Sequence, residues 1–255
     1  SELDVVDKLN FFRTNNKNYI SNSFPTIAAS GPNGAIVHYV PTKKTNRTIK
    51  KNDLLLLDSG AQYYDCTTDV TRTILKGKPT SRIKAIYTSV LKGHIGLSLC
   101  KFPSGTTGSY LDSIARRNLW QHQLNFNHGT GHGVGHCLHV HEGPHRISLG
   151  SNIPLKEGMI FSNEPGYYED NKFGIRIENL VYVKKSMQIN KSLPYLETEV
   201  LTLVPYEKTL IEKKFLQKDE IEWLNRYHKR VFDTISPLLK SDENAWLRDK
   251  CKKIT

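Results

Sequence analysis

The sequence predicts a folded α+β protein, and the order of its patterns carries that prediction. Short apolar runs of strand type occupy residues 27–75, and two segments with apolar residues at helical spacing follow up to residue 122. Further strand-like runs extend from 137 to 203, before a charged amphipathic tail. Strands and helices that are grouped rather than alternating are typical of the α+β class. With 38% hydrophobic residues the chain has a core, which excludes a disordered or collagen-like protein.

Charge and cysteine content bear on partners and location. There are 36 Lys and Arg against 25 Asp and Glu, a formal net charge of +11, but the basic residues are scattered, so we expect no nucleic-acid partner. No apolar run approaches the roughly 18 residues of a membrane span, so we expect no membrane partner. The four cysteines form no CxxC motif and no regular framework, which favours a reducing compartment and predicts a cytoplasmic protein.

In the N-terminal third, one helix and three strands are expected. Leu3, Val6, Leu9 and Phe12 give residues 1–24 a short helical pattern that runs into a loop, interpreted as a remnant or linker of a missing N-terminal region. Strands are expected at 36–39, at 54–57 and at 70–75, and the last two are expected to pair as neighbours.

The rest of the chain begins with two predicted helices. They span residues 81–100 and 109–122, and Ser109 and Asp112 indicate a capped start for the second. Strands are expected around 137–140, 159–162, 175–183 and 199–203. After Pro205 the pattern becomes an amphipathic helix, which Pro237 should end or kink.

Four carboxylates stand in or beside predicted buried strands. Asp58 ends an apolar strand, Asp69 follows eleven residues later, Glu164 follows the strand at 159–162, and Glu178 lies in an apolar segment fourteen residues on. Each alone reads as a turn residue or a surface ion pair. Together they favour a site for a pair of divalent metal ions, because clustered carboxylates without a cation repel each other and take up protons.

Histidines strengthen the metal hypothesis. Six of the ten histidines fall within residues 128–145, although a glycine-rich surface loop or an adventitious metal-binding tract would give the same density. One imidazole joining the four carboxylates suits Mn, Co, Fe or Zn in a dinuclear site, and the spacing alone does not select which histidine it is. The GxSxG, HExxH and Walker motifs are absent from the sequence, and a Cys137 nucleophile is the weaker reading because free cysteines are more often small hydrophobic residues.

The chain resembles the catalytic domain of a known family, the eukaryotic cytosolic Xaa-Pro aminopeptidases. They belong to the pita-bread group of metallopeptidases (peptidase family M24). The strings that carry the resemblance are PTIAASGPNGAIVHY (25–39), LLDSGAQYYDCTTDVTRT (56–73), LKGHI (91–95), HGTGHGVG (128–135), VHEGP (140–144), NEPGYYED (163–170) and FGIRIEN (173–179). The resemblance implies a pita-bread catalytic domain over 25–205 and a helical C-terminal extension over 206–255, packed on or beside that domain.

The resemblance also implies roles for individual residues. The implied metal ligands are Asp58, Asp69, His132, Glu164 and Glu178, and only the family pattern selects His132 among the histidines. Glu164 would also act as general base and acid. His38, His128 and His141 would line the substrate pocket, with His38 and His141 counted as catalytic because His141 would hydrogen-bond the substrate carbonyl. Tyr168 and Arg176 would lie at the pocket or support the ligands from behind.

The implied reaction is hydrolysis of the N-terminal Xaa-Pro peptide bond, with two divalent ions and a bridging water or hydroxide. Mn²⁺ is the expected ion, with Co²⁺ or Zn²⁺ as alternatives. The expected partners are peptides with proline at the second position, and a second copy of the chain is expected to form a homodimer. Prolidase, which cleaves Xaa-Pro dipeptides, is the nearest alternative. A non-catalytic peptide-binding or regulatory protein on the same fold is the alternative from another class.

Overall fold

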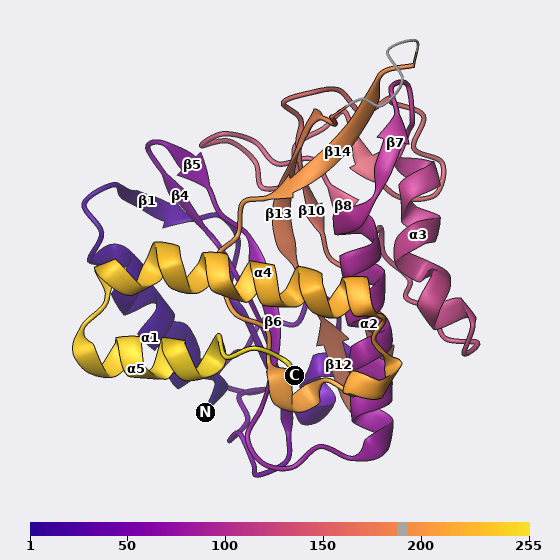
Figure 1. The fold of residues 1–255 in the computed structure, drawn as a ribbon. Coiled ribbons are helices and arrows are strands. Elements are labelled where there is room, and N and C mark those ends of the chain that lie inside the picture. Colours follow the sequence, from indigo (N-terminus) through magenta and orange to yellow (C-terminus); the bar gives the residue numbers. More distant parts are fainter. Residues whose placement is uncertain (188–192) are drawn as a thin grey trace.

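The computed structural model describes residues 1–187 and 193–255, and it confirms the α+β class (Figure 1). The α-helices are α1 (Glu2–Thr14), α2 (Ser81–Leu99), α3 (Gly108–Trp120), α4 (Lys218–Ile235) and α5 (Ser241–Lys250). The strands of the first half are β1 (Tyr19–Asn22), β2 (Ile27–Ser30), β3 (Leu54–Ser59), β4 (Ala61–Tyr63), β5 (Cys66–Thr67), β6 (Val70–Leu75) and β7 (Lys101–Pro103). Those of the second half are β8 (Gly131–His132), β9 (Arg146–Ile147), β10 (Ile160–Asn163), β11 (Gly166–Glu169), β12 (Phe173–Arg176), β13 (Asn179–Lys185) and β14 (Tyr195–Val200).

Two antiparallel sheets form the frame of the molecule. One has the order β2-β3-β6, and the predicted pairing of β3 with β6 is confirmed, with Asp58 opposite Thr71. The short β4–β5 hairpin fills the connection between them, so the chain leaves the sheet after Asp58 and returns near Asp69. The other sheet has the order β10-β13-β14-β7. In both sheets the candidate ligands therefore lie at or next to the ends of strands.

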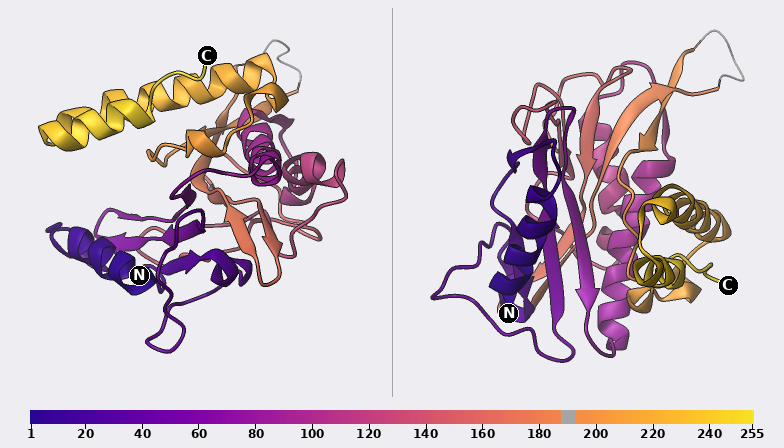
Figure 2. Two further views of the ribbon diagram at one scale, coloured as in Figure 1. Left: turned by 90° about the horizontal axis from the view of Figure 1, so that it is seen from below. Right: turned by 90° about the vertical axis from the view of Figure 1, so that its left-hand side faces the viewer.

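The helices cover the strands on two sides. Helix α1 contacts β2 on one side, while α2, α4 and α5 lie on the other (Figure 2). Helix α4 packs against α2 through the apolar face predicted from the sequence, with Leu224 and Val231 fully buried. A 3-10 turn at Ser236–Leu238, which contains Pro237, ends α4 as expected. Among the described residues, none of the helices combines the length and apolar character needed to cross a bilayer.

The start of α1 is tied firmly to the body of the molecule. The Glu2 side chain is fully buried, and its carboxylate accepts hydrogen bonds from the Ser30 backbone N–H (2.7 Å) and the Tyr39 hydroxyl (2.9 Å). The helix predicted from residues 1–24 is therefore present. It is followed by strand β1, which the sequence pattern did not indicate.

Two predicted strands are wrong. Residues 36–39 form turns, and the strand lies earlier, at β2, because the 3-10 turn Gly31–Ala35 reverses the chain and aims Tyr39 at Glu2. Residues 137–140 form bends, and Cys137 has a positive φ of 54° that a strand does not allow.

Other predictions shift in detail. The strand expected at 175–183 is split into β12 and β13 around Glu178, and the strand expected at 199–203 is β14, which ends at Val200. The predicted cap of α3 is wrong, since Thr107 precedes the helix and its side chain makes no capping bond. Ser109 instead donates to the Ser148 carbonyl, and Asp112 pairs with Arg116 at 2.8 Å.

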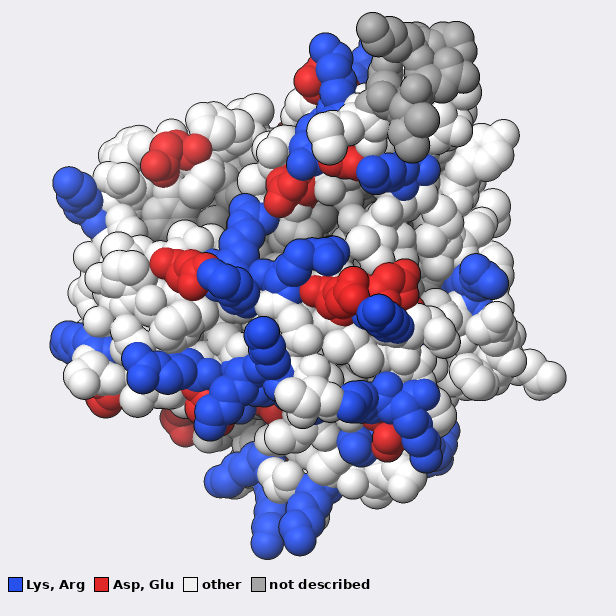
Figure 3. Space-filling model, viewed as in Figure 1, with Lys and Arg blue, Asp and Glu red and all other residues white. Residues whose placement is uncertain are grey.

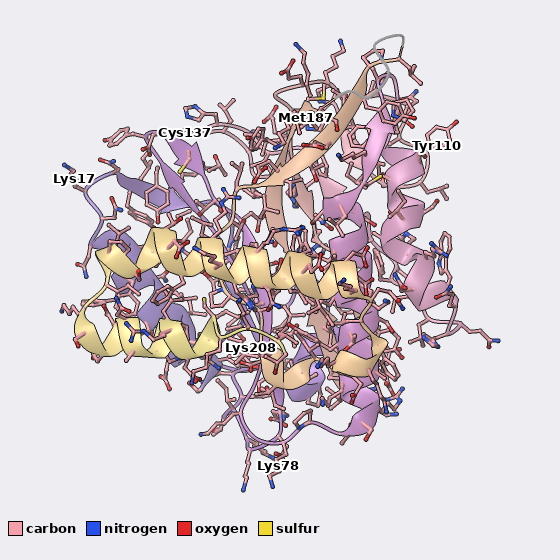
Figure 4. All side chains as sticks on the ribbon, viewed as in Figure 1. Lys17, Lys78, Tyr110, Cys137, Met187 and Lys208 are labelled. Carbon is pink, nitrogen blue, oxygen red and sulfur yellow. The ribbon has the colours of Figure 1, made fainter. Side chains whose placement is uncertain are left out.

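The face formed by α4 and α5 carries charges of both signs. Lys and Arg are interspersed with Asp and Glu there (Figure 3). Lys208, which lies below α4 in Figure 4, donates its ammonium to the carbonyls of Asp249 (2.9 Å) and Lys252 (3.1 Å) at the end of α5. A cation at the carbonyls of a helix C-terminus stabilises the end of the helix and holds α5 on the domain.

The contact between α2 and α3 yields a testable prediction. A Cβ atom at Gly93 would lie 2.0 Å from the Ala115 carbonyl oxygen, whereas one at Gly96, a turn further along α2, would meet its nearest neighbour at 3.5 Å. We expect Gly93→Ala to lower the free energy of unfolding by about 1–3 kcal/mol, because α3 must move away. Gly96→Ala is the control and should be neutral or stabilising by up to about 1 kcal/mol. Urea unfolding measures both, and equal stability of the two variants would contradict the prediction.

Candidate metal centre

The candidate ligands come from ends and junctions of strands in both halves of the fold. Asp58 lies in β3, Asp69 lies between β5 and β6, and His132 lies in β8. Glu164 follows β10, and Glu178 separates β12 from β13. All five residues line one cavity of about 410 Å³. The structure thus brings together residues that are up to 120 positions apart in the sequence.

Close backbone approach brings the histidine to the glutamates. Strand β8 passes so near β10 that a Cβ at Gly131 would lie 1.7 Å from the Ser162 carbonyl oxygen. The His132 N–H donates to the Ser162 hydroxyl (2.9 Å), and this hydroxyl donates to Glu164 Oε1 (2.9 Å). On the other side, the Thr71 hydroxyl donates to Glu178 Oε2 (2.8 Å). Sequence reasoning missed Ser162 and Thr71, whose only signal was their place beside the acidic residues in buried strands.

The donor set fits divalent metal ions. Asp69, His132 and Glu178 each offer a ligand atom, and these atoms lie within 4.8 Å of one another. Asp58 Oδ1 and Asp69 Oδ1 are buried and have no hydrogen-bond partner among the described residues. Buried oxygens without a partner are costly unless a cation or a proton satisfies them.

The orientation of His132 supports the same conclusion. Its Nδ1 lies 3.0 Å from the Gly133 carbonyl, which can only accept, so Nδ1 carries the hydrogen and Nε2 has a lone pair when the ring is neutral. Nε2 faces Glu164 Oε1 at 3.2 Å and Asp69 Oδ2 at 3.6 Å. A backbone carbonyl that fixes the tautomer in this way is typical of histidines that bind metals.

Protons occupy this site when cations are absent. Burial raises the pKa of Asp69, and the charges of the neighbouring carboxylates raise it further. Burial and the charges of Glu164 and Asp58 raise the pKa of Glu178 to about 8. Glu164 and His132 form a second pair, and burial opposes the ionisation of both. Their mutual hydrogen bond nevertheless lowers the pKa of Glu164 to about 2 and raises that of His132 to about 9. The site therefore favours positive charge at its centre.

Arg176 supports the candidate ligand Asp58 from behind. Its fully buried guanidinium donates to Asp58 Oδ2 (2.7 Å) and to the Tyr168 hydroxyl (2.6 Å). Tyr168 in turn donates to His128 Nε2 (2.9 Å), because His128 Nδ1 is used by the Gly129 carbonyl (2.7 Å). Arg176 thus orients the Asp58 carboxylate and, through Tyr168, a histidine of the cavity wall.

Three histidines line the cavity around the ligands. His38 comes from the loop after the 3-10 turn, His128 precedes β8, and His141 lies in the loop after β8. The His141 ring is 4.2 Å from the His132 ring in an edge-on arrangement. Burial lowers the pKa of His141, and a protonated His132 lowers it further, which favours the neutral imidazole.

Two family models match the chain. The model of metallopeptidase family M24 matches residues 1–185, and the model of the C-terminal region of peptidase M24 matches residues 194–254. A probable Xaa-Pro aminopeptidase P from Laccaria bicolor is 48% identical over 262 residues, covering 100% of this chain and 41% of the relative. An aminopeptidase P1 from Lotus japonicus is 48% identical over 252 residues, covering 97% of this chain and 38% of the relative. The chain therefore spans about two fifths of the length of these relatives.

Solved structures show the same fold. The X-prolyl aminopeptidase of Caenorhabditis elegans, described as a cytosolic enzyme with a di-nuclear active site, aligns with a TM-score of 0.96 at 42% identity over 100% of this chain and 42% of that one. Prolidase from Pyrococcus furiosus aligns with a TM-score of 0.68 at 35% identity, over 80% of this chain and 56% of that one. The predicted pita-bread fold is confirmed, and divalent metal ions are implied by the family. This chain belongs to metallopeptidase family M24.

Proposed function

We propose that this chain is the catalytic portion of a Xaa-Pro aminopeptidase, which hydrolyses the peptide bond between the first residue of a peptide and a proline in second position. The observation that carries the proposal is the convergence of four carboxylates and His132 in one cavity walled by three further histidines. The relatives that carry this activity in their names support it. We propose residues 25–205 as the catalytic domain and 206–255 as its helical extension.

Asp58, Asp69, His132, Glu164 and Glu178 would hold two divalent ions. When bound, such ions polarise the scissile carbonyl and lower the pKa of a water molecule. Mn²⁺ is the proposed ion, since carboxylates with one imidazole suit it. Cytoplasmic location and a homodimer, expected from the sequence, are part of the same proposal.

The surrounding side chains would bind the peptide and move protons. Glu164 Oε1 would accept the proton of the attacking water and later return it to the leaving proline nitrogen. His141, neutral at pH 7 because of its lowered pKa, would donate a hydrogen bond to the carbonyl oxygen of the scissile bond. His38 and His128 would pack on the proline ring, and the Tyr168 bond would keep His128 in place.

An assay with paired peptides tests the proposed activity. We expect metal-stripped protein to regain hydrolysis of an Xaa-Pro-Xaa tripeptide on addition of Mn²⁺. Asp58→Asn should lower kcat/KM by at least about 100-fold, because it removes a ligand charge. Asp65→Asn, in the hairpin turn between Asp58 and Asp69 and outside the cavity lining, is the control and should keep activity.

The same assay separates the alternatives. Cleavage of the matching Xaa-Pro dipeptide without cleavage of the tripeptide would assign prolidase activity, which the structural likeness to the Pyrococcus furiosus prolidase supports as second candidate. Tight binding of the tripeptide without turnover, in protein that binds Mn²⁺, would favour a peptide-binding role.

The pKa shifts predict how stability depends on pH. Glu178 and His132 bind protons more tightly in the metal-free folded protein than in the unfolded chain, with pKa values of about 8 and about 9. The folded state therefore holds more protons above about pH 7.5, and its free energy of unfolding falls as the pH rises from about 7.5 to about 9. His94 and His228, with pKa values lowered from 6.5 to about 3 and about 4, take up protons only on unfolding, and this opposing effect has faded by about pH 7.5.

We expect the thermal midpoint in EDTA to fall by at least about 2 °C across this range. With saturating Mn²⁺ the midpoint should stay level or rise, because the cations displace the bound protons. Differential scanning calorimetry at three pH values measures both. A metal-free midpoint that rises with pH would contradict the assignment of protons to this cluster.

A further inference from the structure

Two asparagines stand next to the glutamates of the metal centre. Asn163 precedes Glu164 and Asn179 follows Glu178, and the two asparagines are paired across β10 and β13. Both are fully buried, and neither lines the cavity. The Asn163 amide donates to the His94 carbonyl (2.8 Å), so its side chain belongs to a polar network behind the metal centre.

Arg72 is the cation of that network. Its guanidinium, 5% exposed, donates to the carbonyls of Thr71 (2.9 Å) and Glu178 (2.5 Å) and to Asn179 Oδ1 (2.7 Å). It also donates to acceptors in the C-terminal region: the carbonyls of Val204 (2.7 Å) and Pro205 (3.2 Å) and the Tyr227 hydroxyl (3.1 Å). All of these acceptors are uncharged. A buried guanidinium is costly unless its donors are satisfied, so Arg72 holds the ends of these segments together.

Tyr206 and His94 continue the network to the second glutamate. The Asn179 amide donates to the Tyr206 hydroxyl (2.7 Å), and this hydroxyl donates to His94 Nε2 (2.9 Å). His94 Nδ1 donates to the Asn163 carbonyl (3.0 Å), a direction that follows because a carbonyl only accepts. The Tyr206 ring also packs under the Arg72 guanidinium at 4.5 Å. One chain of hydrogen bonds thus runs from the segment of Glu178 to the segment of Glu164.

We propose that Arg72, His94 and Tyr206 are positioning residues for the metal ligands. The C-terminal region, through residues 204–206 and Tyr227 of α4, thereby helps to hold those ligands in place. The inference rests on the proposed function, because it concerns the same ligands. Its physical basis is that the two glutamate-bearing segments are fixed from the side opposite the cavity. Loss of a bond there shifts a ligand without touching metal or substrate.

The test measures Mn²⁺ affinity in the full chain, by isothermal titration without any peptide. We expect Tyr206→Phe, which removes only the hydroxyl of the chain of bonds, to weaken Mn²⁺ binding about tenfold. Tyr87→Phe is the matched control: Tyr87 is equally buried, but its hydroxyl has no hydrogen-bond partner among the described residues. This variant should bind Mn²⁺ as the unaltered chain does.

A purely structural role would lower stability without changing the affinity of the folded protein. Arg230→Gln tests that distinction, since Arg230 also joins α4 to the sheet, through the Val200 carbonyl (2.8 Å) and Glu199 (2.9 Å), but bonds to none of Arg72, His94 and Tyr206. It should lower the thermal midpoint and leave Mn²⁺ affinity unchanged. Should Tyr206→Phe fail to fold, Tyr227→Phe, which removes one acceptor of Arg72, decides the question by the same titration.

Unchanged Mn²⁺ affinity in the folded Tyr206→Phe or Tyr227→Phe variant overturns the inference, whatever happens to activity. Failure of the proposed function has a different signature: the unaltered chain would bind Mn²⁺ and cleave neither the tripeptide nor the dipeptide. The titration contains no peptide, so the two outcomes are read independently.

Discussion

The rest of the structure depends on one electrostatic constraint: four carboxylates are held in one largely buried cavity. Asp58, Asp69 and Glu178 are each less than 10% exposed, and two of their oxygens have no hydrogen-bond partner among the described residues. Such a cluster is unfavourable unless positive charge enters it. Protons satisfy it in the metal-free protein, as the raised pKa values of Asp69 and Glu178 indicate, and divalent cations satisfy it better because they leave the carboxylates ionised.

Antiparallel topology meets this constraint by placing acids where strands end or break. The β4–β5 hairpin returns the chain from Asp58 to Asp69, and the interruption between β12 and β13 turns Glu178 toward Thr71. Arg176 supplies a permanent buried cation on one side of the cluster. Close backbone contact at Gly131 brings His132 to the other side, so the proposed ligand set is assembled by main-chain geometry rather than by long flexible side chains.

Behind the cavity, a second buried cation binds the C-terminal region to the centre. Arg72 is adjacent to Thr71, which holds Glu178, and its remaining donors reach residues 204–205 and α4. The family model of the C-terminal region covers 194–254, and this segment contributes Tyr206 to the network behind both glutamates. The helical C-terminal region is therefore joined to β6 and to the segment of Glu178 by polar bonds, and it also packs through the apolar face of α4.

The sequence by itself determined the elements whose signals are local and strong. Helices α2 and α4 and strands β3 and β6 follow from long periodic patterns or from continuous apolar runs, and buried acids beside them indicated a metal site. Only the tertiary structure decided the rest. Residues 36–39 and 137–140 resemble strands in sequence, but their backbones turn because contacts distant in sequence, such as Tyr39 with Glu2, outweigh local preference. Likewise, spacing alone did not distinguish His132 from its neighbours, because only the fold decides which imidazole faces carboxylates from other strands.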